Sequence, residues 1–184
     1  MLYSPILSFL KLTVLVPWII TISFFQFIVF CFAKRFFFVF YKFLFFGIRK
    51  IFGIKLKVSG EKETKRVMFI SNHISYLDII ILGSVVNAVF IAKSDIRNWP
   101  IINKLCLLGK TIFIERENRR SVKKQAVLIK ENMENGLNVI LFPEGTSSDG
   151  SKVLSFKSSL FEVIDHEELR NYKLQPISIS YNKL

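Results

Sequence analysis

A histidine and an aspartate lie five residues apart in the segment SNHISYLD (71–78). The apolar run 66–70 before them favours a β-strand, and the apolar run after them favours a buried helix with Ser75 as its N-cap. His73 would then lie in the strand-to-helix loop, with Asp78 close enough to bond its ring. A carboxylate on one imidazole nitrogen fixes the tautomer and leaves the other nitrogen free to accept a proton. The spacing predicts a general base and its orienting group; the alternative is a loop histidine capped by a polar neighbour.

The composition indicates that one part of the chain lies in lipid and the other in water. The chain has 184 residues, enough for one domain with a real core. Residues 1–57 hold 14 of the 20 Phe, eight Lys or Arg and no Asp or Glu, and they supply +8 of the net charge of +12. Residues 58–184 hold 18 basic and 14 acidic residues. We therefore expect hydrophobic membrane-anchoring helices over 1–57 and the catalytic domain over 58–184.

The anchoring region contains two apolar runs. Leu12 to Ala33 is 22 residues without a charge, and a helix needs about 20 to span the hydrocarbon. Pro17 is tolerable in such a helix. The second run, 36–48, is too short to span and is expected to lie in one leaflet with its basic residues at the head groups. The alternatives are two buried core helices, or an anchor unrelated to function. Basic residues after the first run favour a catalytic part on the cytoplasmic face.

Several other classes of function find no support in the sequence. The basic excess lies beside apolar runs rather than on a patterned helix, and no nucleic-acid-binding motif is present, so anionic lipid is the better partner. Cys31 and Cys106 are single and distant, which favours reduced thiols in apolar settings. Neither a metal-ligand spacing nor a glycine-rich nucleotide loop occurs, so we expect no metal and no bound cofactor.

From residue 58 onward, short apolar strands alternate with helices. This pattern predicts an α/β domain with a mixed, mostly parallel sheet flanked by helices, preceded by the hydrophobic anchoring pair. In such sheets, reactive groups gather in the loops beyond the strand ends. The strands are expected at 66–70, 88–92, 111–115, 138–142 and 176–181, and the helices at 76–86, 99–108, 119–134 and 156–164.

Two further loops carry groups suited to a substrate. After strand 138–142 comes Pro143-Glu144-Gly145, in which the glycine allows a turn that presents free N–H groups, beside a carboxylate. After strand 111–115 comes Arg116, placed to grip a phosphate or a carboxylate. Each loop alone is also typical of a plain turn or a solvated charge run. Their combination with His73 and Asp78 in one small sheet favours a site.

At this point the chain resembles a known family. The blocks NHISYLD (72–78), KTIFIER (110–116), FPEGTSS (142–148) and QPISIS (175–180) are similar, in order, to the four blocks of the phospholipid/glycerol acyltransferases, such as the 1-acyl-sn-glycerol-3-phosphate acyltransferases. The resemblance covers roughly 65–181, and four ordered blocks are far more specific than one His–Asp pair. An aromatic helix pair before the domain is also similar to that family's membrane anchor.

The resemblance implies a role for each matching residue. His73 matches the catalytic base and Asp78 its partner, while Pro176 matches the final apolar block. One departure is Ser147, where many members with a phosphate acceptor have arginine, so one contribution to phosphate binding is absent. The implied substrate-binding residues are Asn72, Ser75, Lys93, Arg116, Glu144, Gly145 and Thr146.

The implied function is transfer of a fatty acyl group from acyl-CoA or acyl-carrier protein to the hydroxyl of a lysophospholipid, giving phosphatidic acid from 1-acyl-sn-glycerol-3-phosphate. The alternatives are the same chemistry on another lysolipid, such as lyso-ornithine lipid, or an inactive lipid-binding fragment. Leu184 follows directly after the last expected strand, so a C-terminally incomplete domain is also an open alternative. Acyl-chain length and oligomeric state do not follow from the sequence.

Overall fold

The computed structural model describes residues 4–115, 121–148 and 152–181. The chain divides into two compact units. The first contains the chain up to Gly60, the segment Ile79–Val86 and the residues from Tyr181 on. The second contains Glu61–Asp78 and Asn87–Ser180 and carries the sheet.

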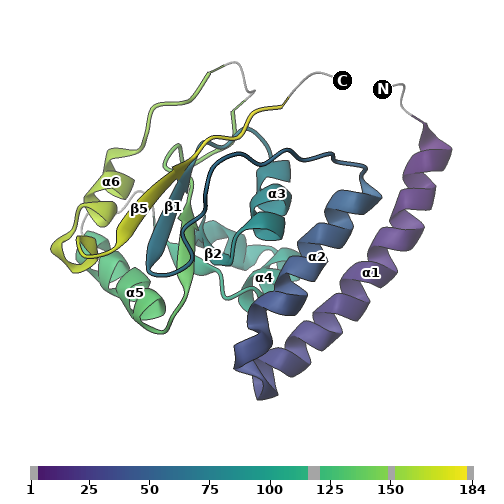
Figure 1. The fold of residues 1–184 in the computed structure, drawn as a ribbon, viewed down its shortest axis with the longest axis horizontal. Helices are drawn as coiled ribbons and strands as arrows, with labels where there is room; N and C mark the ends of the chain where they lie inside the picture. Colours follow the sequence, from purple (N-terminus) through teal and green to yellow (C-terminus); the bar gives the residue numbers. More distant parts are fainter. Residues whose placement is uncertain (1–3, 116–120, 149–151, 182–184) are drawn as a thin grey trace. The chain divides into compact units, whose positions relative to one another are not determined.

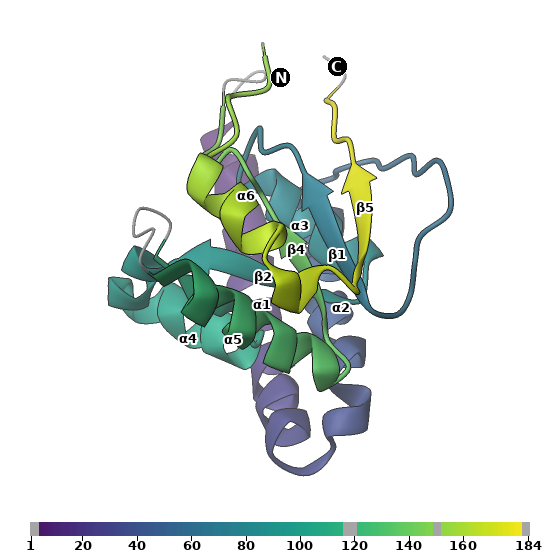
Figure 2. The same ribbon diagram turned by 90° about the vertical axis from the view of Figure 1, so that its left-hand side faces the viewer.

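The sheet of the second unit has five strands in the order β3-β2-β4-β1-β5, and all four pairings between them are parallel (Figures 1 and 2). The central strands are buried along nearly their whole length, as expected for parallel strands covered on both faces. The prediction of an α/β fold with a mostly parallel sheet flanked by helices is confirmed. The strands are β1 (Val67–Ser71), β2 (Ala88–Lys93), β3 (Ile112–Ile114), β4 (Asn138–Leu141) and β5 (Lys173–Ile177).

The register brings three loops to one edge of the sheet. Ile70 of β1 lies opposite Leu141 of β4, and Phe90 of β2 lies opposite Ile140 of β4. Because these strands are parallel, the loops that follow β1, β2 and β4 all emerge at the carboxyl edge, where open α/β sheets bind their ligands. The loop after β1 carries His73, and the loop after β4 carries Glu144.

The helices of the second unit differ in how much they bury. α5 (Val122–Glu134) and α6 (Ser158–Ile164) lie side by side (Figure 2), and α5 contacts β3 and β4. Their inward residues Ala126, Ile129, Leu160 and Val163 are almost completely buried. α4 (Pro100–Leu108), after the short helix η2 (Ser94–Asn98), has no buried residue. A second short helix, η4 (Glu167–Leu169), is joined to α5 by the Lys130–Glu168 ion pair of 2.5 Å. α3 (Leu77–Val85) begins in the second unit and ends in the first.

The first unit contains two adjacent antiparallel helices, α1 (Pro5–Phe32) and α2 (Phe37–Ile51), joined by the short helix η1 (Lys34–Phe36) (Figure 1). The Trp18 indole N–H donates to the Leu44 carbonyl at 3.2 Å. A side chain at Gly47 would collide with the Trp18 ring, so glycine permits the close approach of the two helices. The Phe25 and Phe40 rings stack with centroids 5.6 Å apart.

α1 presents apolar side chains along most of its surface. Ile6 is 75% exposed, Phe9 66%, Ile20 64% and Phe24 61%. With 28 residues, α1 is about 42 Å long, and it is long and apolar enough to cross a bilayer. Of the helices within the described residues it is alone in this, since α2 has 15 residues. This agrees with the sequence expectation that, of the two apolar runs, the first alone is long enough to span.

Two elements, β5 and α5, differ from the sequence prediction by three residues or more at an end, and the other predicted strands and helices of this unit differ by at most two. β5 covers Lys173–Ile177 instead of 176–181, so Pro176 lies inside the strand, which is possible because β5 is an edge strand. Beyond the strand, the backbone at Ile179 bonds the Asn72 side chain rather than continuing the ladder. α5 begins at Val122, after Ser121, instead of at 119. Residues 116–120, which include Arg116, lie outside the described residues.

A buried asparagine joins the amino ends of three strands. Asn138, at the start of β4, is only 5% exposed. Its Oδ1 accepts from the Val67 N–H of β1 at 3.2 Å. Its Nδ2 donates to the Thr64 carbonyl at 2.8 Å and to the Asn87 carbonyl, just before β2, at 3.0 Å. Asn138 therefore fixes the relative heights of β1, β2 and β4, and with them the loops at the opposite edge.

Replacing Asn138 with leucine should destabilise the domain strongly. The variant keeps the side-chain size but removes the partner of the buried Val67 N–H and of the Thr64 and Asn87 carbonyls, which belong to exposed residues. A buried donor left without a partner costs about 1–3 kcal/mol, whereas water can reach the two carbonyls. We expect the free energy of unfolding to fall by about 1–3 kcal/mol. Urea denaturation of the detergent-solubilised protein would measure it. Asn132→Leu on α5, where the side chain bonds only the Leu128 carbonyl, is the control, and equal losses in the two variants would contradict the assigned role.

Candidate active site

The loop between β1 and α3 turns the chain within five residues. β1 ends at Ser71 and α3 begins at Leu77. The Ser75 hydroxyl accepts from the Leu77 N–H at 3.2 Å, and the Ser75 carbonyl accepts from the Asp78 N–H at 3.0 Å. Ser75 therefore caps the helix, as its position in the sequence predicts. The cap fixes where Asp78 points, because Asp78 lies in the first turn.

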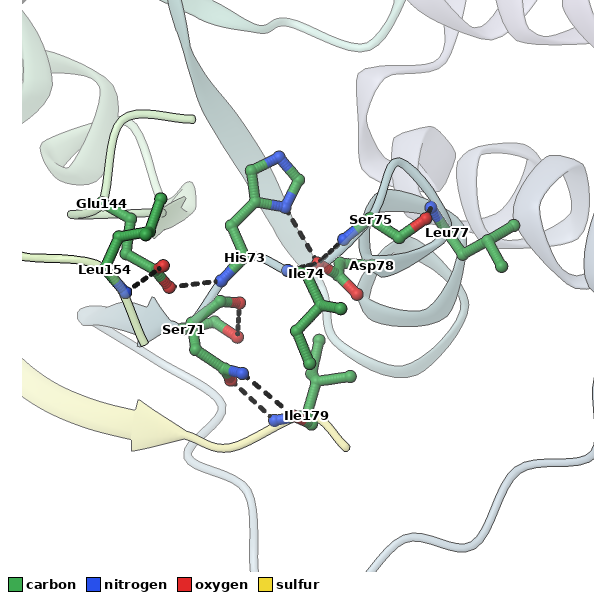
Figure 3. A network of polar contacts seen from close by, with 10 residues as sticks. Ser71, His73, Ile74, Ser75, Leu77, Asp78, Glu144, Leu154 and Ile179 are labelled. Carbon is green, nitrogen blue, oxygen red and sulfur yellow. Dashed lines mark hydrogen bonds and ion pairs between the residues drawn. The ribbon is translucent and has the colours of Figure 1, made fainter. Parts of the chain in front are cut away.

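His73 and Asp78 are in direct contact. The His73 Nδ1 lies 2.8 Å from Asp78 Oδ2 (Figure 3). The same oxygen accepts the backbone N–H groups of Ile74 at 2.7 Å and Ser75 at 2.9 Å. Asp78 is completely buried. A buried carboxylate needs such donors to offset its lost hydration, so the loop backbone and the ring together hold the charge in place.

This geometry determines the tautomer of the histidine. Asp78 Oδ2 already accepts two backbone N–H groups, so it acts as a carboxylate oxygen and the ring must donate to it. The proton of a neutral imidazole is therefore on Nδ1, and Nε2 carries the lone pair. Nε2 faces away from Asp78 (Figure 3) and has no hydrogen-bond partner among the described residues. The ring is arranged to accept a proton from outside the loop.

Aromatic stacking restrains the same ring from its flat side. The His73 and Phe142 rings stack with centroids 4.2 Å apart at 19°. Phe142 in turn lies 6.2 Å from Phe90 at 12°. Consequently the His73 side chain is only 12% exposed. His73 follows β1, Phe142 directly follows β4 and Phe90 lies within β2, so the sheet register sets the ring plane while Asp78 sets its rotation.

Glu144 holds the backbone of His73 from the loop after β4. It is 1% exposed, and both carboxylate oxygens accept backbone N–H groups, His73 at 2.7 Å and Leu154 at 2.8 Å (Figure 3). The Ser148 N–H donates to the His73 carbonyl at 2.9 Å. Both backbone polar groups of His73 are therefore bonded to this loop. Glu144 shapes the site by holding the His73 backbone, and its contact with the acceptor stays a prediction.

Asn72 performs a similar task on the other side of the histidine. Its Nδ2 donates to the Ile179 carbonyl at 2.9 Å, and its Oδ1 accepts the Ile179 N–H at 2.8 Å. The side chain thus pairs with the backbone as a neighbouring strand would. It joins the loop after β1 to the chain that follows β5. Contact of Asn72 or Ser75 with substrate stays a prediction.

The turn after β4 leaves two N–H groups for a ligand. Gly145 has a φ of 75°, the left-handed conformation that favours glycine, and its N–H closes the turn on the Phe142 carbonyl at 3.1 Å. The N–H groups of Thr146 and Ser147 make no hydrogen bond with any residue in the described part of the chain. Thr146 is exposed. Within the described part of the chain these two N–H groups therefore differ from the Gly145 N–H, which the turn itself engages.

Of the two basic residues of the predicted site, Lys93 lies within the described residues and Arg116 does not. Lys93 is the last residue of β2, at the same edge of the sheet, and its Nζ lies 2.8 Å from Asp95 Oδ2. Arg116 lies outside the described residues, so its contact with phosphate stays a prediction. The last described residue before it is Glu115, whose carbonyl accepts the Gln125 Nε2 of α5 at 2.9 Å. Within the described ranges, no three His, Cys, Asp or Glu side chains are grouped to hold a metal ion.

Sequence reasoning missed the parts of the site that depend on strand pairing. Phe142 belongs to the block FPEGTSS (142–148), but its stacking against the His73 ring follows only from the pairing of β1 with β4. Leu154, the second partner of Glu144, carries no chemical signal because it acts through its backbone. The one available signal was Glu144 itself, since a carboxylate directly after a buried strand must find donors.

Replacing Glu144 with glutamine should loosen the histidine loop. The two oxygens of Glu144 each accept one N–H group, whereas glutamine has one acceptor oxygen and can satisfy one of the two donors. Hydrogen bonds to a charged group contribute about 1.5–3 kcal/mol. We expect the free energy of unfolding to fall by about that amount, with faster amide exchange at His73 and Leu154. Hydrogen exchange read by mass spectrometry measures both. The exposed Glu162→Gln on α6 is the control; unchanged exchange at the two amides would rule out the brace.

The chain is similar to several known proteins. It is 39% identical over 136 residues to the lyso-ornithine lipid O-acyltransferase of Rhizobium meliloti, covering 71% of this chain and 47% of that protein. It is 34% identical over 110 residues to the 1-acyl-sn-glycerol-3-phosphate acyltransferase of Neisseria gonorrhoeae, covering 60% of this chain and 43% of that protein. It thus spans about half the length of the curated relatives it matches.

The fold also has a solved counterpart. The crystal structure of the 1-acyl-sn-glycerophosphate acyltransferase PlsC from Thermotoga maritima superposes with a TM-score of 0.66 at 21% identity, covering 93% of this chain and 72% of that one. That likeness shows the α/β fold. The family model described as Acyltransferase matches residues 55–180, well over half of the sequence. The chain therefore belongs to the Acyltransferase family.

Proposed function

We propose that this chain is the catalytic part of a membrane-bound O-acyltransferase that moves a fatty acyl group from a thioester donor to the hydroxyl of a lysolipid. The observation that carries the proposal is the His73 ring. Its Nδ1 is held by a buried carboxylate at 2.8 Å, and its Nε2 faces outward. Family membership gives the reaction type, and the donor is acyl-CoA or acyl-carrier protein.

The reaction requires one proton to move twice. His73 Nε2 takes the proton of the acceptor hydroxyl as the hydroxyl oxygen attacks the thioester carbonyl. A new C–O bond forms, the C–S bond then breaks, and the departing thiolate takes the proton back from the imidazolium. Asp78 stabilises the imidazolium without taking its proton. No acyl-enzyme is needed, and burial raises the pKa of the Cys106 thiol, which makes it a poor nucleophile at neutral pH.

The tetrahedral intermediate carries a negative oxygen that needs hydrogen-bond donors. The unengaged N–H groups of Thr146 and Ser147 suit this task, because fixed donors stabilise developing charge without reorganising. The Ile74 and Ser75 N–H groups near the helix start are bonded to Asp78. Of the two locations expected for such donors, the glycine turn is therefore the better supported.

Variants of the pair should separate the base from its orienting group. His73→Ala removes the base and should abolish transfer. Asp78→Asn should lower kcat by about 10³–10⁴, the loss seen when a hydrolytic triad loses its carboxylate, with little change in KM. Steady-state kinetics in mixed micelles would measure both, with circular dichroism to verify folding. A kcat above a tenth of wild type in His73→Ala would refute the general-base role.

The main proposal for the acceptor is 1-acyl-sn-glycerol-3-phosphate, giving phosphatidic acid. Lyso-ornithine lipid is the second candidate, and specific observations favour it. Ser147 stands where many members with phosphate acceptors have arginine, and the relative at 39% identity is named for lyso-ornithine lipid. The Lys93–Asp95 pair near the site also offers one charge of each sign, as a zwitterionic head group would require.

An acceptor panel would decide between them. Purified protein with labelled acyl-CoA is offered lysophosphatidic acid and lyso-ornithine lipid, and the products are resolved by chromatography. Phosphatidic acid formed with the higher kcat/KM supports the main proposal, and a clear preference for the ornithine acceptor overturns it. If neither acceptor reacts while both bind, the chain is an inactive lipid-binding fragment.

Ser147→Arg should alter the preference in a predictable direction. A charge-assisted bond to phosphate contributes about 1.5–3 kcal/mol, so kcat/KM for the phosphate acceptor should rise roughly 10- to 150-fold. The zwitterionic acceptor should gain little. Ser147→Gln adds length without charge and serves as the control. Equal effects of the two variants on both acceptors would place residue 147 outside the head-group site.

Membrane attachment through α1 follows from its length and exposed apolar surface. We propose that the catalytic domain lies on the cytoplasmic side, because Lys34 and Arg35 directly follow the apolar run. At this position the domain has access both to the donor, which is water-soluble at its carrier end, and to the acceptor, which resides in the bilayer. Holding both at the interface replaces diffusion by positioning.

A further inference from the structure

The apolar residues of α4 are exposed or only partly covered by the protein. Six of its nine residues are Ile, Leu or Cys, yet none is buried. By contrast, α5 of the same unit buries Ala126, Ile129 and Met133. Ile101 is 75% exposed, Leu107 55%, and Trp99, directly before the helix, 48%. Apolar groups exposed together over so short a segment indicate a surface that is covered by something else.

The exposed side of α4 combines apolar and basic residues. Ile101, Lys104 and Leu107 follow one another at three-residue steps, which places them along one side of the helix. Trp99 precedes them as the N-cap residue. The Arg97 guanidinium lies 4.8 Å from the centre of the Phe113 ring, which holds this cation close to the start of the helix. The segment therefore presents a tryptophan, aliphatic side chains and cations together.

The charge of this segment identifies its partner. Residues 96–114 contain three basic residues, Arg97, Lys104 and Lys110, and no Asp or Glu. Residues 1–57 have the same combination of basic and apolar residues without an acid. The core of a protein interface is depleted in lysine. A bilayer boundary instead accommodates aromatic rings at the head groups, aliphatic groups below them and lysines at the lipid phosphates.

We propose that the segment Arg97–Leu107 inserts into the head-group region of an anionic bilayer, as a second lipid contact in addition to α1. Trp99, Ile101 and Leu107 enter the boundary with the acyl chains, and Arg97 and Lys104 bind lipid phosphates. The contact goes beyond acyl transfer and does not depend on it, since it rests on exposure and charge alone. It would hold the sheet-bearing unit against the lipid surface.

The tryptophan content of the chain allows a direct test. The chain has two tryptophans, Trp18 in α1 and Trp99. The full-length Trp18→Phe variant, in which Trp99 is the one remaining reporter, is reconstituted into vesicles whose lipids carry bromine either near the glycerol or deep in the acyl chain. We expect blue-shifted Trp99 emission, with stronger quenching by the shallow bromines. The quenching should be greater in phosphatidylglycerol than in phosphatidylcholine. Trp99→Phe, which leaves Trp18, reports α1 in parallel.

Matched variants make the outcomes decisive. In the Trp18→Phe background, Leu107→Glu should reduce the bromine quenching of Trp99, whereas Leu128→Glu on α5, where Leu128 is 36% exposed, should leave it unchanged. If Trp18→Phe does not fold, the Trp99 signal is obtained by subtracting Trp99→Phe from wild type. Water-like emission without quenching overturns the proposal. Blue-shifted emission without lipid quenching also overturns it, because protein rather than lipid would then cover α4. Acceptor turnover plays no part in this measurement, so failure of the proposed function would not be mistaken for failure of the lipid contact.

Discussion

The site depends on one buried carboxylate oxygen. Asp78 Oδ2 takes three donors, the His73 ring and the N–H groups of Ile74 and Ser75. The two backbone bonds fold the loop and the ring bond orients the proposed base, so one oxygen sets both the loop conformation and the orientation of the ring. The three donors also explain how a charge can be completely buried, since removing any of them would leave the carboxylate partly unpaired.

Other residues at the same edge of the sheet restrain the parts of His73 that Asp78 does not hold. Asp78 holds the ring of His73, Glu144 holds its backbone N–H, and Phe142 holds the ring plane. Asp78 comes from the β1–α3 segment, and the other two come from the β4 loop, so the pairing of β1 with β4 determines whether the restraints meet at one histidine. Asn138 fixes that pairing at the opposite end of the strands. Such preorganisation from rigid elements is what a base requires to act on a bound hydroxyl.

The sequence predicted what is local and missed what depends on register. The His73–Asp78 contact and the Ser75 cap follow from spacing within one loop, and the parallel sheet follows from continuous apolar strands alternating with helices. The bonds of Glu144 span 71 and 10 residues, so they depend on which strands are neighbours. The shift of β5 arises from its pairing with β1, which no local pattern of residues 173–181 specifies. Arg116 lies outside the described residues, and the proposed choice of acceptor rests on individual side chains such as Ser147 and Lys93 rather than on the fold.

The polar groups of the site are largely satisfied within the loops, and this bears on where the site can work. His73 N–H and carbonyl, the N–H groups of Ile74 and Ser75, and both oxygens of Glu144 all bond inside the protein. Bringing these loops to a lipid surface therefore requires little further loss of hydration, because unpaired polar groups are what make such a transfer costly. Among the groups that have no partner within the described residues are the His73 Nε2 and the N–H groups of Thr146 and Ser147. In the proposed reaction a hydroxyl and a developing oxyanion would engage these groups, so the polar groups that hold the loops together are distinct from those that the reaction would use.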